Sequence, residues 1–193
     1  SPLNLNPSAN IFIKSLKKNI PIASSVPKWS ATSKALPPVF KLNKYGTNIK
    51  LGYIPQEIKF DNEELNILEE SRKYYRDDET HLRSALFKFL FPGDHIYKRI
   101  KNLSGGEKIR LKLFCMIQSK YNFLILDEPT NHIDIDTREI LEKALIDFNG
   151  TILFISHDRY FINKVANSIA VLKDKKIQRY LGNYNDYLVY KNK

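Results

Sequence analysis

Short apolar runs alternate with amphipathic stretches along the second half of the chain. Residues 123–126 (FLIL) and 151–155 (TILFI) are apolar throughout, as in parallel strands that are buried on both faces. Between them, residues 136–148 repeat apolar side chains at helical spacing, and Gly150 is expected to end this helix. Strands that alternate with helices in this way predict an α/β fold, with a mostly parallel sheet flanked by helices.

Weaker patterns predict further elements around this core. Residues 49–54 (IKLGYI) have the composition of a strand, and charged, helix-compatible patterns fill residues 61–92. A helix is expected to begin at Ser104, because Glu107 three residues later completes a capping box. Residues 168–180 predict a closing hairpin near the end of the chain.

The first quarter of the chain is basic and carries few structural signals. Residues 11–18 are compatible with a short helix, and residues 21–38 are rich in Pro, Ser, Ala and Lys, as in a loop or linker. Nine lysines and a single glutamate give residues 1–60 a charge of +8, out of +10 for the whole chain. We expect residues 1–48 to be a separate basic Pro/Ser-rich segment, which either binds a polyanion such as RNA or only solubilises the chain.

Composition narrows the class of protein. No apolar run approaches the roughly 20 residues of a transmembrane helix, and no signal peptide is visible at the start. The single cysteine, Cys115, excludes an internal disulfide and lies in an apolar stretch, which favours a buried thiol in a reducing compartment. These features predict a soluble, cytoplasmic protein.

Polar side chains follow both apolar runs at the point where each run ends. Asp127 and Glu128 come directly after FLIL, and Ser156, His157 and Asp158 come directly after TILFI. In open α/β sheets, ligands bind beyond the carboxyl ends of the strands. The pattern therefore predicts an active-site rim at this edge of the sheet.

The residue types at this edge suit phosphoryl chemistry. Asp127 could hold Mg²⁺, which takes few protein ligands and several waters, and Glu128 could orient or deprotonate an attacking water. His157 could contact a γ-phosphate, and Gln56, after the first predicted strand, could bind a metal or water. Exposed acids at a strand-end turn and a structural histidine are the alternatives.

A second candidate site lies at the start of the helix that follows Ser104. Gly105 and Gly106 leave backbone N–H groups accessible at the helix N-terminus, where the helix dipole also favours an anion. Ser104 adds a hydroxyl group. The alternative interpretation is an ordinary capped helix start.

Five motifs occur in order along residues 49–190: GYIPQ, LSGGE, FLILDEPTNHID, ISHDRYF and LGNYNDYLVYK. Together they resemble the nucleotide-binding domain of ATP-binding-cassette (ABC) proteins, in which LSGGE is the signature, FLILDE the Walker B strand, NHID the D-loop and SHD the switch-histidine motif. DEPTNHID followed by SHDRYF is more typical of the ABC-F class than of transporters. The resemblance implies a P-loop-NTPase-like fold for residues 49–193, with a small helical subdomain at about residues 61–103.

The resemblance also implies ATP and Mg²⁺ as cofactors and a catalytic role for the sheet edge. Asp127 would bind Mg²⁺, with Gln56 near the metal and the attacking water. Glu128 would be the general base, and His157 would sense the γ-phosphate.

A second ABC cassette is the implied partner, because ABC sites are shared between two cassettes. The signature segment, defined here as Ser104, Gly105 and Gly106, would grip the γ-phosphate of an ATP bound to that partner. Residues 131–134 would cross the interface between the two cassettes.

One part of the family pattern is missing from the sequence. ABC domains carry a phosphate-binding loop, G-x-x-x-x-G-K-S/T, and none of the seven glycines here precedes a lysine. Residues 5–16 (LNPSANIFIKSL) stand where this Walker A loop belongs, either as a degenerate loop or as a boundary with foreign sequence. We therefore expect the 193-residue chain by itself to bind Mg-ATP weakly and to hydrolyse it negligibly.

The leading interpretation is an ATPase cassette, the second of two, from a soluble ABC-F protein that acts on the ribosome in translation or antibiotic protection. ATP would clamp the two cassettes together, and hydrolysis would release them. The alternatives are the ATPase subunit of a membrane transporter, and a degenerate cassette that completes a partner's site without hydrolysis.

Overall fold

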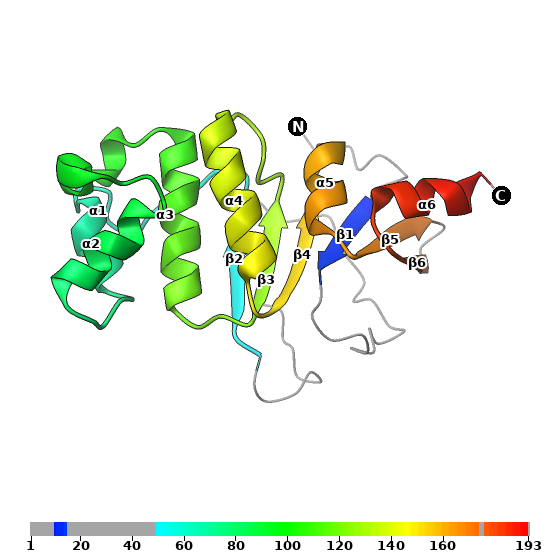
Figure 1. Cartoon of the computed structure of the whole chain (residues 1–193), viewed down its shortest axis with the longest axis horizontal. Coiled ribbons are helices and arrows are strands. Elements are labelled where there is room, and N and C mark those ends of the chain that lie inside the picture. The colour runs from blue at the N-terminus through cyan, green and yellow to red at the C-terminus, as the bar shows by residue number, and fades with distance from the viewer. Residues whose placement is uncertain (1–9, 15–48, 174–175, 193) are drawn as a thin grey trace.

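The computed structural model describes residues 10–14, 49–173 and 176–192, which form a sheet with helices packed on it (Figure 1). The sheet order is β2-β3-β4-β1-β5-β6. The strands are β1 (Asn10–Lys14), β2 (Leu51–Ile54), β3 (Phe123–Asp127), β4 (Thr151–Ile155), β5 (Ser168–Lys173) and β6 (Lys176–Leu181). The helices are α1 (Ile67–Arg72), α2 (Glu79–Phe87), α3 (Gly105–Gln118), α4 (Ile135–Asp147), α5 (Arg159–Val165) and α6 (Tyr184–Lys191), with two short 3₁₀ helices, η1 (Gly93–Tyr97) and η2 (Ile100–Asn102).

The α/β fold predicted from the sequence is confirmed. Strands β2, β3 and β4 are parallel, with Tyr53 opposite Ile125 and Ile125 opposite Leu153. The other half of the sheet is antiparallel, because β5 and β6 form the predicted hairpin and β1 runs antiparallel to both of its neighbours. The parallel half therefore carries the two strand ends at which the sequence places its polar residues.

The N-terminal segment differs from expectation. Residues 10–14 form strand β1 between β4 and β5, so the predicted helix at residues 11–18 is wrong over residues 11–14. A short apolar segment that can hydrogen-bond to a strand on each side gains more from the sheet than from one isolated helical turn. Residues 15–18 and the rest of the predicted basic segment lie outside the described residues.

The main core lies between the parallel strands and helices α3, α4 and α5, which stand in a row in front of the sheet in Figure 1. Leu124 and Leu126 of β3 are fully buried, whereas Phe123 and Ile125 on its other face are half-buried. The predicted burial of this strand is therefore complete on the face toward the helices and partial on the other face.

A second apolar cluster lies at the other end of the molecule, where α1, α2, η1 and η2 pack on the outer face of α3. Leu111 and Phe114 of α3 belong to this cluster, whereas Leu113 belongs to the main core. Cys115 is buried here as expected, and burial raises the pKa of its thiol to about 12. Helix α3 thus joins the helical region to the sheet.

Gly150 is needed for a different reason from the one the sequence suggested. Helix α4 already ends at Asp147, and its C-cap Phe148 has extended backbone angles. A Cβ atom on Gly150 would lie 2.5 Å from the backbone oxygen of Asn122 and 2.4 Å from the Phe148 ring. This oxygen accepts the N–H of Thr151 at the start of β4, so the close approach is part of strand pairing.

We expect Gly150→Ala to lower the free energy of unfolding by about 1–3 kcal/mol, because a backbone oxygen cannot move aside as a flexible side chain can. Gly105→Ala is the matched control, since a Cβ there would meet nothing within 4 Å. Thermal unfolding of both variants checks this. Equal melting temperatures for Gly150→Ala and the wild type would show that the contact is not restrictive.

Candidate functional site

The carboxyl edge of the parallel sheet brings two of the predicted site residues into contact. Asp127 ends β3 opposite Ile155 of β4, and the N–H of Glu128 donates to the Ile155 oxygen at 3.0 Å. The strand pairing therefore continues one residue past Asp127. It places Glu128 beside the turn that carries His157.

Glu128 contacts His157 through both of its carboxylate oxygens. The His157 backbone N–H donates to Oε2 at 3.2 Å, and the imidazole Nε2 lies 3.2 Å from Oε1. The Glu128 side chain is 11% exposed and that of His157 is 91% exposed, so the carboxylate is sheltered while the ring faces solvent. Glu128 has a φ of +46°, in the left-handed region that residues other than glycine seldom adopt.

Asp127 is a half-buried carboxylate next to this pair, and burial raises its pKa. Within residues 49–173 and 176–192, no lysine or arginine pairs with it. Its charge adds to the effect of burial in raising the pKa of Tyr53, on the adjoining strand. A half-buried carboxylate that pairs with no cation among the described residues fits a site for Mg²⁺, which binds through one or two carboxylates together with water and phosphate oxygens.

Gln56 follows β2 at the same edge, two residues after Ile54, which pairs with Leu126. Its side chain is exposed, and the structure records no contact between it and Asp127 or Glu128. No group of three or more His, Cys, Asp and Glu side chains in the described residues could enclose a metal. The edge therefore offers few protein ligands, as is usual for Mg²⁺ held together with phosphates.

The signature segment lies at the N-terminus of α3. Ser104 is the N-cap residue, and the predicted capping box is present, since its hydroxyl accepts the N–H of Glu107. Ser104 and Gly105 are exposed, and the space in front of Gly105 is open. An anion could therefore reach the backbone at Ser104 and Gly105.

Gly106 is buried and touches the start of α4. A Cβ atom at this position would lie 3.2 Å from both Asp134 Oδ2 and Thr137 Oγ1. Asp134 caps α4 by accepting the backbone N–H and the hydroxyl of Thr137, each at 2.8 Å. Arg110 of α3 donates to the Thr137 hydroxyl at 2.7 Å. The signature segment and the end of residues 131–134 are thus in contact within one chain.

The turn that carries His157 is anchored to α4 and α5 by ion pairs that the sequence did not reveal. Asp158 caps α5 and accepts a hydrogen bond from Arg138 of α4 at 3.0 Å. Arg138 also contacts the buried Glu142 at 3.1 Å, and Lys164 of α5 contacts the same carboxylate at 2.7 Å. These pairs fix the residue that directly follows His157.

Sequence reasoning also missed two partners of Glu107. His95 and Lys98 both bind its carboxylate, at 2.6 Å and 2.9 Å, and the Ser104 N–H donates to it at 2.6 Å. Burial of Glu107 alone would raise its pKa, but these hydrogen bonds and the Lys98 charge lower the pKa to about 2. Only the capping box was visible in the sequence, because nothing marks residues nine and twelve positions upstream as partners.

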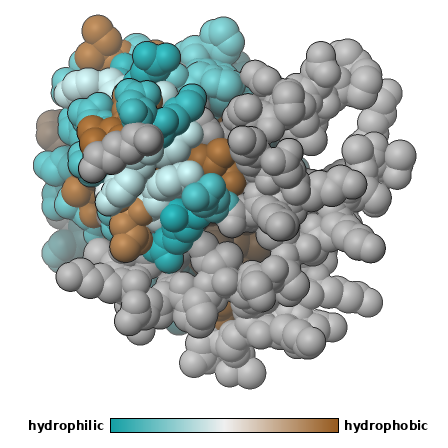
Figure 2. Space-filling model, turned by 90° about the vertical axis from the view of Figure 1, so that its right-hand side faces the viewer, coloured by the Kyte–Doolittle hydropathy of each residue, from teal (hydrophilic) through white to brown (hydrophobic). Residues whose placement is uncertain are grey.

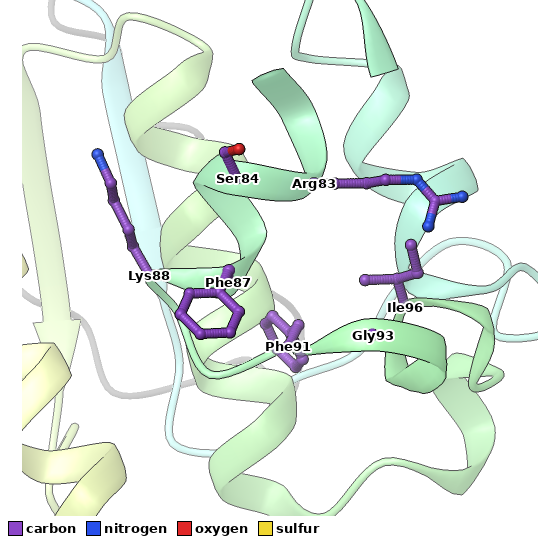
Figure 3. Close-up of a pocket in the computed structure, with 7 residues that line it drawn as sticks. All are labelled: Arg83, Ser84, Phe87, Lys88, Phe91, Gly93 and Ile96. Atoms are coloured by element: carbon purple, nitrogen blue, oxygen red, sulfur yellow. The ribbon is translucent and has the colours of Figure 1, made fainter. Parts of the chain in front are cut away.

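A pocket among the described residues lies elsewhere. A shallow pocket of about 470 Å³ lies between α2 and η1, where Phe87, Phe91 and Ile96 form its apolar wall and Arg83 and Lys88 stand at its rim (Figure 3). It contains none of the predicted site residues. The candidate site is therefore the sheet edge together with the signature segment.

At the end of the molecule that carries α6 and β6, hydrophilic and hydrophobic side chains are interspersed (Figure 2). Among the described residues, no helix combines the length and apolar character that crossing a membrane requires.

Comparison with known proteins agrees with this geometry. Residues 39–131 match the family described as ABC transporter. The chain is 48% identical over 144 residues to YdiF of Bacillus subtilis, named as an ATP-binding protein, across 74% of this chain and 22% of that protein. It is 38% identical over 119 residues to ABC transporter F family member 5 of Arabidopsis thaliana, across 62% of this chain and 17% of that protein.

Solved structures share the fold at low sequence identity. An ATP-binding subunit of an ABC transporter has a TM-score of 0.59 at 20% identity, covering 74% of this chain and 62% of that one. An archaeal ribosome recycling factor, solved with a ribosomal stalk protein, has a TM-score of 0.54 at 20% identity, covering 67% of this chain and 25% of that one.

The sequence matches are to ABC ATP-binding proteins, and the solved structures share their fold. The chain is similar to ATP-binding proteins of the ABC type, and its relatives include a member of the ABC-F class, as its motifs indicated. It spans only 22% of YdiF and 28% of YbiT, an ATP-binding protein of Escherichia coli that is 40% identical to it. The activity and partners of a whole protein are therefore matters for proposal.

Acid is expected to weaken the fold through Glu107. Its folded pKa of about 2 lies below the ordinary 4.5, so its ion pairs stabilise the fold above pH 4.5 and are lost as the pH falls toward 2. The full contribution is on the order of 3 kcal/mol. Urea denaturation from pH 7 to pH 3.5 should show a steeper loss of stability below pH 4.5 for the wild type than for Glu107→Gln.

Glu57→Gln, at an acid whose side chain is 81% exposed, is the control and should keep the wild-type slope. Parallel curves for the wild type and Glu107→Gln would contradict this account of Glu107.

Proposed function

We propose that the chain is one cassette of a two-cassette ABC-F ATPase that acts on the ribosome. The observation that carries the proposal is the contact between Glu128 and His157 at the carboxyl edge of β3 and β4, beside the half-buried carboxylate of Asp127. In a purely structural ion pair or turn, there would be no reason for the Glu128 carboxylate to be sheltered while the His157 imidazole that contacts it is exposed.

In this proposal the sheet edge holds the reacting end of ATP. Asp127, with Gln56, would hold Mg²⁺, which when bound neutralises charge on the phosphate oxygens. Glu128 accepts a proton from the attacking water, and its orientation is fixed by the backbone N–H of His157 at 3.2 Å. The exposed His157 imidazole would contact the γ-phosphate, which distinguishes ATP from ADP.

The signature segment serves the other cassette. It lies at the N-terminus of α3, with Ser104 and Gly105 exposed, so its N–H groups and hydroxyl can reach a phosphate that another domain holds. ATP then lies between two cassettes and closes them, and hydrolysis removes the γ-phosphate that joins them. This division also gives the chain a function in a shared site despite its missing glycine-lysine loop.

Three observations support a ribosomal target. The chain has a net charge of +10, its motifs DEPTNHID and SHDRYF are typical of ABC-F proteins, and an ABC-F protein is among its relatives. A basic protein is attracted to RNA-rich particles through the phosphate backbone. The same features lead us to propose a cytoplasmic location.

Glu128→Gln in the two-cassette protein tests the catalytic role. We expect ATP hydrolysis, followed by phosphate release, to fall by about 10²–10⁴-fold, because an amide cannot take the proton from water. ATP should then hold the cassettes closed, so ATP-dependent co-sedimentation with ribosomal particles should increase rather than disappear.

Glu139→Gln, at an exposed acid on α4, is the control and should behave as the wild type in both assays. Undiminished hydrolysis by Glu128→Gln would remove Glu128 from the reaction. Co-purification of the protein with membranes in place of ribosomal particles would contradict the proposed target.

A further inference from the structure

Glu107 connects the signature segment to the helical region. Its side chain is 10% exposed and lies between α3 and the residues that follow α2. Oε2 accepts the N–H of Ser104 at 2.6 Å and the ammonium of Lys98 at 2.9 Å, while Oε1 lies 2.6 Å from His95 Nε2. The carboxylate therefore binds three groups from two separate segments.

The two side-chain partners are themselves fixed. The backbone oxygen of Lys98 accepts a hydrogen bond from the backbone N–H of Ile67 at 3.2 Å. The backbone N–H of Lys98 donates to the backbone oxygen of His95 at 2.9 Å. The His95 ring packs edge-on against Phe91, with centroids 6.0 Å apart. Ile96, between them in sequence, is buried in the helical cluster. Hydrogen bonds and packing within the helical region thus hold Lys98 and His95 beside Glu107.

This anchoring sets the shape of the signature segment. Ser104 is held extended, with φ −65° and ψ 165°, because its N–H and hydroxyl are both used in the capping box with Glu107. The N–H groups of Gly105 and Gly106, the next two at the helix start, have no acceptor recorded in the described part of the chain. On the other side, Gly106 lies close against Asp134 and Thr137, since a Cβ atom there would be 3.2 Å from an oxygen of each. The segment is therefore fixed from both sides with two donors left over.

We propose that Lys98 and His95 are positioning residues for the shared ATP site, acting through Glu107 to hold the N–H groups of Gly105 and Gly106 in place for a γ-phosphate. The inference rests on the proposed function, because it needs the signature segment to meet ATP on the other cassette. Neither residue touches the nucleotide. Their contribution is to spare the segment the conformational entropy of becoming ordered when ATP binds.

A purely structural role for the same ion pair makes different predictions. A structural defect would lower thermal stability and would weaken the binding of ATP and ADP alike. A positioning defect would weaken the binding of ATP, which has the γ-phosphate, and would leave the affinity for ADP unchanged. The comparison of ATP with ADP is therefore the informative measurement.

The test uses the two-cassette protein with Lys98→Gln, which removes the charge. Closure of the cassettes is followed by small-angle scattering during ATP titration, ADP binding by calorimetry, and folding by thermal unfolding. We expect the ATP concentration for half-closure to rise about tenfold, as for the loss of one charge-assisted hydrogen bond, with ADP affinity unchanged. His95→Ala should shift it in the same direction by a smaller factor and provides a second variant if Lys98→Gln folds poorly.

Two further variants complete the design. Lys98→Arg keeps a cation within reach of Glu107 and should restore closure to near the wild-type ATP concentration. Lys101→Gln is the matched control, since Lys101 lies three residues after Lys98 and pairs at 2.8 Å with the exposed Glu64 instead of with Glu107.

The outcomes separate the inference from the proposed function. Wild-type protein that closes with ATP, while Lys98→Gln and His95→Ala close at the same ATP concentration, would overturn the positioning role and leave the proposed function intact. Equal losses of ATP and ADP affinity with a lower melting temperature would also overturn it, in favour of a structural role. Wild-type protein that does not close with ATP would contradict the proposed function itself.

Discussion

The parallel pairing of β3 with β4 is the interaction on which the rest of the candidate site depends. It places Asp127 opposite Ile155, and the further bond from Glu128 N–H to the Ile155 oxygen carries the pairing past the strand end. Glu128 can then meet His157 although the two residues are 29 positions apart. A shift of this pairing by one residue would reverse which side chains face the helices and would separate the two.

Helix α3 connects the helical region to the two candidate sites, which are the sheet edge and the signature segment. One of its faces packs in the sheet core and the other in the helical cluster, while its N-terminus carries the signature segment (Figure 1). Gly106 touches Asp134, which lies six residues after Glu128 along the chain. A movement of the helical region would therefore reach the signature segment through Glu107, and a movement of the catalytic edge would reach it through Asp134.

Local patterns in the sequence predicted much of this arrangement. The runs 123–126 and 151–155 and the capping box of Ser104 with Glu107 depend on neighbouring residues, so periodicity and spacing were sufficient to find them. The contacts that escaped prediction are between distant segments. Strand β1 forms because it pairs with a strand on each side, and Gly150 is required because the backbone of Asn122 lies close to it. Lys98 matters because it lies beside Glu107. None of these contacts is between neighbouring residues in the sequence.

The central claim is that one chain contributes the sheet edge to one ATP and the signature segment to another. Substituting Mn²⁺ for Mg²⁺ in the nucleotide complex of the two-cassette protein tests it directly, because the paramagnetic ion broadens nearby amide resonances. We predict broadening at Asp127 and Glu128 with either nucleotide, and a shift of the Gly105 and Gly106 resonances only with ATP. Unchanged resonances at all four residues, with broadening instead around the pocket between α2 and η1, would contradict the account.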